Sequence, residues 1–143
     1  MINRNRWKQE VQKRLVPDDD GISRLPDNMV GKGWKIVVCD LIDRLDATGV
    51  PYKITIMREK FAVLSVHLRA AHPHPDAFKE AIKASCNASS VTCEDCGAAG
   101  EMRGAGWRRT LCLPCDGKFS KRRLKRFRSL RKALCGRKGL LEA

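Results

Sequence analysis

Apolar side chains recur at helical spacing in the first half of the chain. Residues 3–15 place three of them one turn apart, which predicts a short amphipathic helix with Trp7, Val11 and Leu15 on one side. Residues 34–48 predict a longer helix, with Gly49 as its C-cap. Its apolar face would hold Trp34, Val37, Val38, Leu41, Ile42 and Leu45. Residues 16–33 show no period and predict a loop.

Alternating apolar and polar residues follow this helix. They predict two strands over residues 52–57 and 61–68, joined by a reversal at Arg58-Glu59-Lys60, with Tyr52, Ile54 and Ile56 on one face. A loop over residues 69–75 then leads to a third helix over residues 76–87. Asp76 would cap that helix, and its inward residues would be Phe78, Ala81, Ile82 and Ser85.

Two pairs of cysteines carry the clearest chemistry. Cys93-x2-Cys96 and Cys112-x2-Cys115 are separated by fifteen residues, a spacing typical of zinc sites. Gly97 gives the first pair the backbone freedom that a metal-binding knuckle needs. Four protein ligands leave no open coordination position, so we predict one structural Zn²⁺ rather than a catalytic one. The alternative is four buried or redox-active cysteines.

The residues around these pairs predict the shape of the zinc module. Glu101–Arg103 and Trp107–Leu111 flank Gly104-Ala105-Gly106, which indicates a hairpin. Pro114 stands where a helix would begin, and a helical pattern runs from Gly117 to about Cys135. Knuckle, hairpin and ligand-bearing helix make a treble clef, and a two-knuckle zinc ribbon is the alternative. Cys39 lies on an apolar helix face and is predicted to be a core residue, whereas Cys86 and Cys135 give no signal.

These patterns divide the 143 residues into three parts and predict an α+β fold. The parts are a basic helix and loop over 1–33, an α+β lobe over 34–91, and a four-cysteine zinc module with a basic helix over 92–143. No stretch approaches the roughly 18 apolar residues that span a membrane, and the N-terminus lacks the apolar core of a signal peptide. We therefore expect a cytoplasmic protein, in which seven cysteines favour metal and free thiols over disulfides.

Positive charge is concentrated at the C-terminal end of the chain. The net charge is +13, and residues 117–143 hold eleven Lys or Arg against one acidic residue, Glu142. The spacing of three, four, three and four places five cations in one stripe along a helix, namely Lys118, Lys121, Lys125, Arg128 and Lys132. Arg122, Arg126 and Arg131 flank the stripe.

This basic stripe predicts a polyanionic partner, because a row of cations matches a row of phosphates. Nucleic acid, DNA or RNA, is the leading prediction, with an acidic protein surface and a merely solvated helix face as alternatives. Arg108 and Arg109 would add phosphate contacts, and Trp107 would either stack on a base or cover the metal. A membrane partner is not expected, since the apolar face of the helix would pack on the zinc module.

We do not expect an enzyme or a small-molecule substrate. His72-Pro73-His74 lacks further ligands nearby, and Asp18-Asp19-Asp20 fits a solvated linker better than a cation site. A nuclease of the ββα-metal type would need His with Asn or Asp near the zinc module, but residues 93–143 contain neither His nor Asn.

Several short motifs together suggest a family. They are Gly33-Trp34, Arg58-Glu59-Lys60-Phe61, Thr92-Cys93-Glu94-Asp95-Cys96-Gly97, Gly106-Trp107 and Thr110-Leu111-Cys112-Leu113-Pro114-Cys115. Residues 33–115 thereby resemble small, largely uncharacterised zinc proteins of phages and prophages. The chain departs from that pattern after Phe61, where the family has small glycines and this chain has Ala62-Val63. The resemblance implies a role in an infected bacterial cell but no known activity, and the basic tail lies outside it.

Together these features predict a phage-type, zinc-binding nucleic-acid-binding protein that regulates transcription or acts on a host nucleoprotein machine. The alternative is an inhibitor or adaptor that binds a host protein complex, such as RNA polymerase or a defence system. In that case the basic helix would occupy an acidic or nucleic-acid-binding groove.

Overall fold

A computed structural model describes residues 1–16, 30–70 and 75–136, with residues 123–124 and 127–136 as backbone only. The fold is mixed α+β, as predicted, and it falls into two compact units, Met1–Cys112 and Leu113–Ala143. The first unit contains two short 3-10 helices, Arg4–Arg6 and Lys32–Trp34, and the elements α1 Trp7–Gln12, α2 Lys35–Asp46, β1 Tyr52–Lys60, β2 Val63–Ala70, α3 Asp76–Ser90, β3 Glu101–Arg103 and β4 Arg109–Leu111. The second unit contains α4, Leu113–Gly136.

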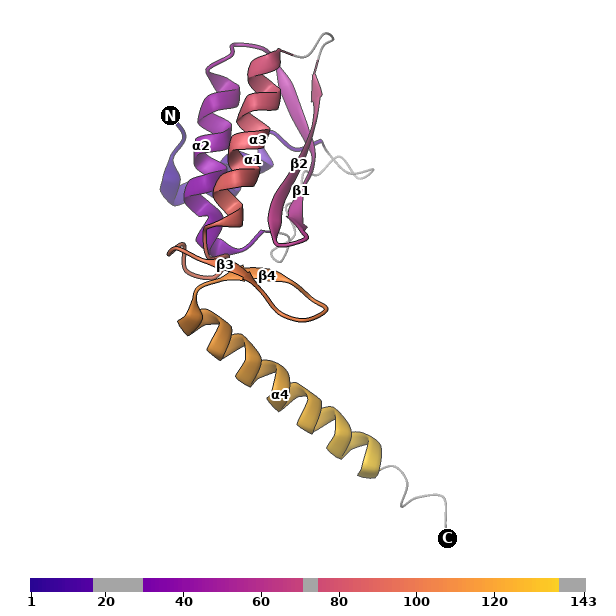
Figure 1. The fold of residues 1–143 in the computed structure, drawn as a ribbon. Coiled ribbons are helices and arrows are strands. Elements are labelled where there is room, and N and C mark those ends of the chain that lie inside the picture. The colour runs from indigo at the N-terminus through magenta and orange to yellow at the C-terminus, as the bar shows by residue number, and fades with distance from the viewer. Residues whose placement is uncertain (17–29, 71–74, 137–143) are drawn as a thin grey trace. The chain divides into compact units, whose positions relative to one another are not determined.

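The core of the first unit lies between two helices and a two-stranded sheet. Helices α2 and α3 run side by side and cover one face of the antiparallel β1–β2 pair (Figure 1). All six residues predicted for the apolar face of residues 34–48 are buried. Cys39 is fully buried among them, which confirms its predicted core position, and this burial raises the pKa of its thiol.

The N-terminal segment packs on the same core, but its helix is shorter than predicted. Trp7, Val11 and Leu15 are buried, as their spacing indicated. The helix ends at Gln12 because the following backbone pairs with β1 instead. The N–H of Ile54 donates to the carbonyl of Arg14 at 2.7 Å, and the N–H of Val16 donates to the carbonyl of Ile54 at 2.9 Å. The predicted loop and acidic run over residues 17–29 lie outside the described residues.

The β1–β2 hairpin corrects two predictions. Strand β1 continues to Lys60, so the reversal lies at Phe61-Ala62 and not at residues 58–60. Both turn residues adopt left-handed backbone, with φ of 53° and 66°. Tertiary bonds hold this unusual turn: the N–H of Ala62 donates to Glu59 Oε1 at 2.7 Å, and Thr110 Oγ1 donates to the carbonyl of Ala62 at 2.6 Å.

The second correction concerns the faces of β1. A β-bulge between Ile54 and Ile56 shifts the alternation, so Ile54 and Met57 are the buried pair and Ile56 is half-exposed. The bulge lies next to Ile54, where the backbone of residues 14–16 pairs with β1. The alternation of apolar and polar residues in the sequence does not predict it.

Helix α3 is longer than predicted and begins differently. Pro75 is its N-cap, Asp76 is its first residue, and the helix continues to Ser90. Its inward side buries Phe78, Ala81 and Ser85 as expected, and Ile82 packs partly buried against the core. The buried Ser89 hydroxyl donates to the carbonyl of Cys86 and accepts the N–H of Leu64 at 2.8 Å, so the serine fastens helix α3 to strand β2. Among the described helices, none is both long and apolar enough to cross a membrane.

Candidate metal centre

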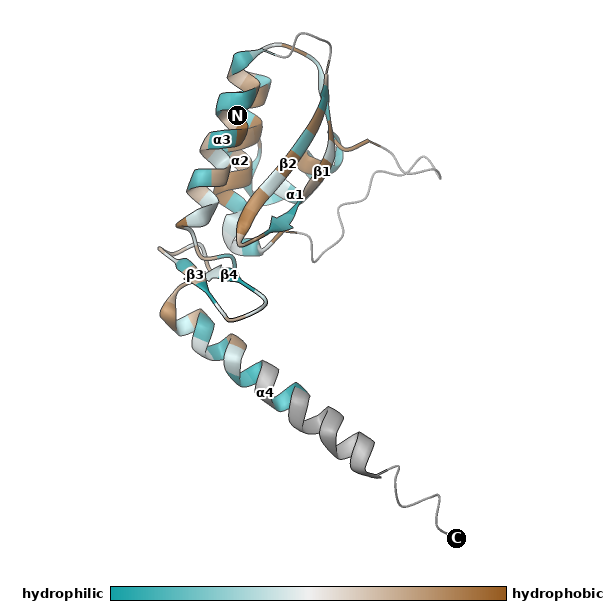
Figure 2. Cartoon of the chain, turned by 45° about the vertical axis from the view of Figure 1, so that its right-hand side comes forward, coloured by the Kyte–Doolittle hydropathy of each residue, from teal (hydrophilic) through white to brown (hydrophobic). Residues whose placement is uncertain are grey.

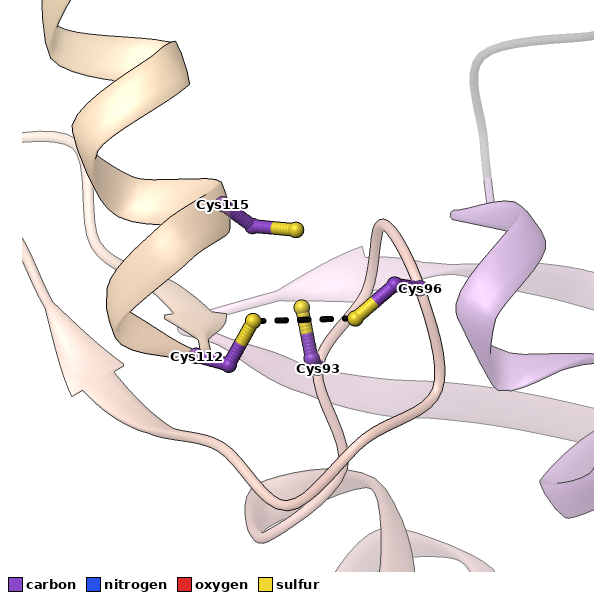
Figure 3. A group of neighbouring side chains, drawn as sticks. All are labelled: Cys93, Cys96, Cys112 and Cys115. Carbon is purple, nitrogen blue, oxygen red and sulfur yellow. Dashed lines mark hydrogen bonds between the residues drawn. The ribbon is translucent and has the colours of Figure 1, made fainter.

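Four cysteines converge at one point (Figure 3). Cys93 and Cys96 lie in the loop between α3 and β3, Cys112 follows β4, and Cys115 lies in the first turn of α4. Their four sulfur atoms all lie within 4.8 Å of one another. The residues predicted as ligands are therefore brought together, although their two sequence pairs are fifteen residues apart.

The sulfur geometry fits a metal ion and not a disulfide. A tetrahedral ion with metal–sulfur bonds of about 2.3 Å requires sulfur–sulfur distances of about 3.8 Å. The Sγ atoms of Cys96 and Cys112 are 3.6 Å apart, whereas a disulfide would need about 2.05 Å. None of these four cysteines forms a disulfide. They are thus positioned to hold a metal ion.

Local backbone bonds shape the first pair into a knuckle. The N–H of Gly97 donates to the carbonyl of Cys93 at 2.9 Å, and Gly97 has a left-handed φ of 82°, which uses the backbone freedom expected of a glycine there. Burial alone would raise the pKa of Cys93, but hydrogen bonds from the backbone of Cys112, Cys96 and Asp95 outweigh it and lower the pKa to about 7. The Cys93 thiol therefore loses its proton more readily than an ordinary cysteine thiol, and the thiolate is the form that binds metal.

The segment before α2, residues 31–34, packs against this knuckle. The sequence pattern did not predict this contact. The N–H of Gly33 donates to the carbonyl of Glu94 at 2.7 Å, and Trp34 Nε1 donates to the carbonyl of Thr92 at 2.7 Å. A Cβ at Gly33 would lie 2.1 Å from the carbonyl oxygen of Cys93. The available signal was Gly31-x-Gly33 directly before a helix, since two nearby glycines permit close backbone approach.

Glu94 fastens the knuckle to β4 from inside the protein. The residue is only 2 % exposed, and its carboxylate accepts the Nε–H of Arg109 at 2.8 Å and the N–H of Thr110 at 3.0 Å. Burial raises the pKa of this carboxyl, although the bonds from Thr110 and Arg109 act against the shift. Arg109 also donates to Asp95 at 3.0 Å, so this guanidinium binds both residues between the first two ligands.

Of the predicted nucleic-acid contacts, Arg109 is partly buried in its ion pairs with Glu94 and Asp95, and the others are exposed where their side chains are described. Arg108 is exposed on the hairpin, and Trp107 beside it is 69 % exposed. In α4, the predicted contacts Lys118, Lys121, Arg122 and Lys125 have exposed side chains. Arg128 and Lys132 belong to the same helix, but their side chains are outside the described set, as is Cys135. His72, His74 and Asp18–Asp20 are outside the described residues altogether.

No model of a protein family, no curated protein and no solved structure matches this chain.

Proposed function

We propose that this protein is a zinc-dependent nucleic-acid-binding protein in which the metal is structural. Four cysteine sulfurs that all lie within 4.8 Å of one another are the observation that carries the zinc assignment, because Zn²⁺ is commonly bound by four cysteine thiolates in structural sites. All four coordination positions would be filled by protein. The metal would then bind no substrate, which supports a non-enzymatic role.

The order of elements around the cysteines supports a treble clef. A knuckle is followed by the β3–β4 hairpin, and the second cysteine pair stands at the beginning of α4. Cys115 shares this helix with the basic stripe, three residues before Lys118. We propose that the metal fixes the N-terminal turn of the helix that carries most of the net charge.

The basic stripe supports nucleic acid as the partner. Lys118, Lys121 and Lys125 are exposed, and the spacing of three and four residues places their charges along one side of α4. No acidic residue interrupts residues 117–141, whereas a face that serves solubility alone normally mixes both signs. With the resemblance to phage and prophage zinc proteins, this supports a regulator of transcription, or of a host nucleoprotein machine, in the bacterial cytoplasm.

Titration of labelled DNA and RNA against the zinc-loaded protein between about 50 and 200 mM salt tests the proposal. The stripe variant changes Lys118, Lys121 and Lys125 to Gln, which keeps helix propensity nearly constant. A matched control removes the same charge from the outer sides of α2 and α3 through Arg44→Gln, Lys79→Gln and Lys83→Gln.

The logarithm of the binding constant falls as the logarithm of the salt concentration rises. We expect this dependence to be shallower in the stripe variant by about 2 to 3 in slope, or about 0.7–0.9 per lost phosphate contact. The control should change the slope far less. A wild-type protein that binds neither DNA nor RNA at low salt would contradict the nucleic-acid proposal. Metal analysis that finds well under one zinc per chain would contradict the zinc assignment.

A host protein is the second candidate partner, and exposed apolar side chains favour it. Trp107 and Met102 lie exposed on the β3–β4 hairpin, where a protein interface would cover them. Affinity capture from nuclease-treated bacterial lysate, compared with a Trp107→Ser and Met102→Ser variant, separates the two candidates. A captured protein that this variant fails to retain would favour the protein partner.

A further inference from the structure

The outer face of the β1–β2 hairpin is a second basic surface, separate from α4. The inner face, with Ile54, Met57, Leu64 and Val66, is buried against α2 and α3. The side chains on the opposite face include five basic residues and no acidic one. We define this outer hairpin face by Lys53, Arg58, Lys60, His67 and Arg69, all of which are exposed. Hydrophilic and hydrophobic stretches alternate along the ribbons of β1 and β2 (Figure 2).

The arrangement of these charges is unfavourable for the protein alone. Lys53 and Arg69 are direct cross-strand partners, and like charges in that position repel. Arg58 and Lys60 are two residues apart on one strand and therefore share a face. Within the part of the chain that the structure describes, none of these four forms an ion pair. The one acidic residue of the hairpin, Glu59, instead bonds the turn at Ala62.

The hairpin tip adds an exposed ring to this surface. Phe61 is 76 % exposed with φ of 53°, a conformation that is strained for a bulky residue. Lys60 Nζ lies 5.6 Å from its ring centre, so cation and ring are adjacent. The turn is nevertheless held in place, because Thr110 binds the carbonyl of the next residue. Strain of this kind, kept at an exposed position, is common at functional sites.

We propose that the outer hairpin face binds the phosphate backbone of a nucleic acid, with Phe61 placed to stack on a base at its end. From Lys53 to Lys60 the strand runs about 23 Å, which is enough for several successive phosphates. A two-stranded ribbon of this width also fits a major groove. The inference rests on the proposed nucleic-acid-binding function and adds a second contact surface to it.

The test uses the full-length, zinc-loaded protein and a short fluorescein-labelled DNA, as a single strand and as a duplex. The hairpin variant carries Arg58→Gln, Lys60→Gln and Arg69→Gln. The α2–α3 variant with Arg44→Gln, Lys79→Gln and Lys83→Gln removes the same charge elsewhere, and the α4 stripe variant is measured beside both. Thermal unfolding of each variant checks that the fold is retained, and loss of cross-strand repulsion should leave the hairpin variant at least as stable as wild type.

We expect the hairpin variant to bind one or both DNA forms at least about tenfold more weakly than the α2–α3 control does. Its binding should also depend less steeply on salt, by about 2 in the slope of log K against log salt. Equal DNA affinity of the hairpin variant and the control would overturn the inference. If the stripe variant still binds DNA more weakly in that experiment, the proposed function stands. If wild type binds neither DNA form at low salt, nor a single-stranded RNA of the same length, both proposals fail together. If Phe61→Ser lowers the affinity for the single strand more than the affinity for the duplex, base stacking by Phe61 is supported. If the variant binds both forms as tightly as wild type does, Phe61 has no stacking role.

Discussion

Gly33 offers the sharpest test of how the metal centre is built. Its backbone lies against the knuckle, and a Cβ there would stand 2.1 Å from the Cys93 carbonyl oxygen, 2.6 Å from the Gly97 nitrogen and 2.8 Å from the Cys96 nitrogen. All three neighbours are backbone atoms, so no flexible side chain can move aside. Gly33→Ala must therefore displace the chain that carries Cys93 and Cys96.

The free-energy cost of Gly33→Ala has two sources, overpacking by the added methyl group and one weakened hydrogen bond. Forcing a methyl group into a packed site costs about 1–3 kcal/mol, and weakening the bond from the Gly33 N–H to Glu94 costs about 1 kcal/mol more. The metal-free knuckle can relax, whereas the metal-bound knuckle must keep its geometry. Metal binding should thus become less favourable by about 2 kcal/mol, which weakens the affinity for the metal roughly 30-fold.

Competition with a chromophoric zinc chelator measures this affinity directly, and urea unfolding of the zinc-loaded protein measures stability. Gly49→Ala is the matched control, because Gly49 has open space around it and a φ of 69°. That variant should cost about 1–2 kcal/mol of stability through its backbone alone and leave the zinc affinity unchanged. A Gly33→Ala protein with wild-type zinc affinity would refute the idea that this segment positions the ligands.

Three further results are expected. Phe61→Gly should raise the free energy of unfolding by about 1 kcal/mol in urea titration, because it relieves a left-handed φ and removes an exposed ring; a less stable variant would contradict this. Thr110→Val should cost about 1–3 kcal/mol by the same assay, since the buried carbonyl of Ala62 loses its donor, whereas the exposed Thr55→Val should cost far less. Asp46 should contribute to acid unfolding: burial alone would raise its pKa, but bonds from Arg14 and Tyr52 hold it below 3.8. Its stabilisation is present above pH 3.8 and lost as pH falls through the folded-state pKa, so Asp46→Asn should flatten the stability curve in that acid range.

Helix positions and the ligand set were predictable because their signals are local. The apolar face of residues 34–48 repeats at helical spacing, and packing of α2 on α3 and the sheet obeys that repeat. Each cysteine pair likewise needs only a tight turn to present two sulfurs. The local pattern was enough to predict the four cysteines that the structure brings together.

The turn at Phe61-Ala62 was not predictable, because its cause is distant in sequence. Neither residue favours left-handed backbone, and the reversal was therefore expected at Arg58-Glu59-Lys60. The bond that holds Ala62 comes from Thr110, which is 48 residues away. The contact of Trp34 with Thr92 spans 58 residues and was equally invisible. Such contacts depend on how the elements pack and leave no periodic trace.

The contacts of Glu94 indicate that folding of the first compact unit would order Cys93 before metal binds. Its carbonyl accepts from Gly33, its N–H donates to the Thr110 carbonyl at 2.9 Å, and its carboxylate binds Arg109. Each bond comes from the folded first unit, and Cys93 is the adjacent residue. Ordering of this ligand is thus achieved by folding, which leaves more of the metal–sulfur free energy available as affinity. By linkage, a bound metal would stabilise this unit in return, by about 2.7 kcal/mol when its free concentration is 100 times the Kd. Metal binding and folding of the first unit would therefore be coupled, although the sequence pattern separates the zinc module from the α+β lobe at residue 92.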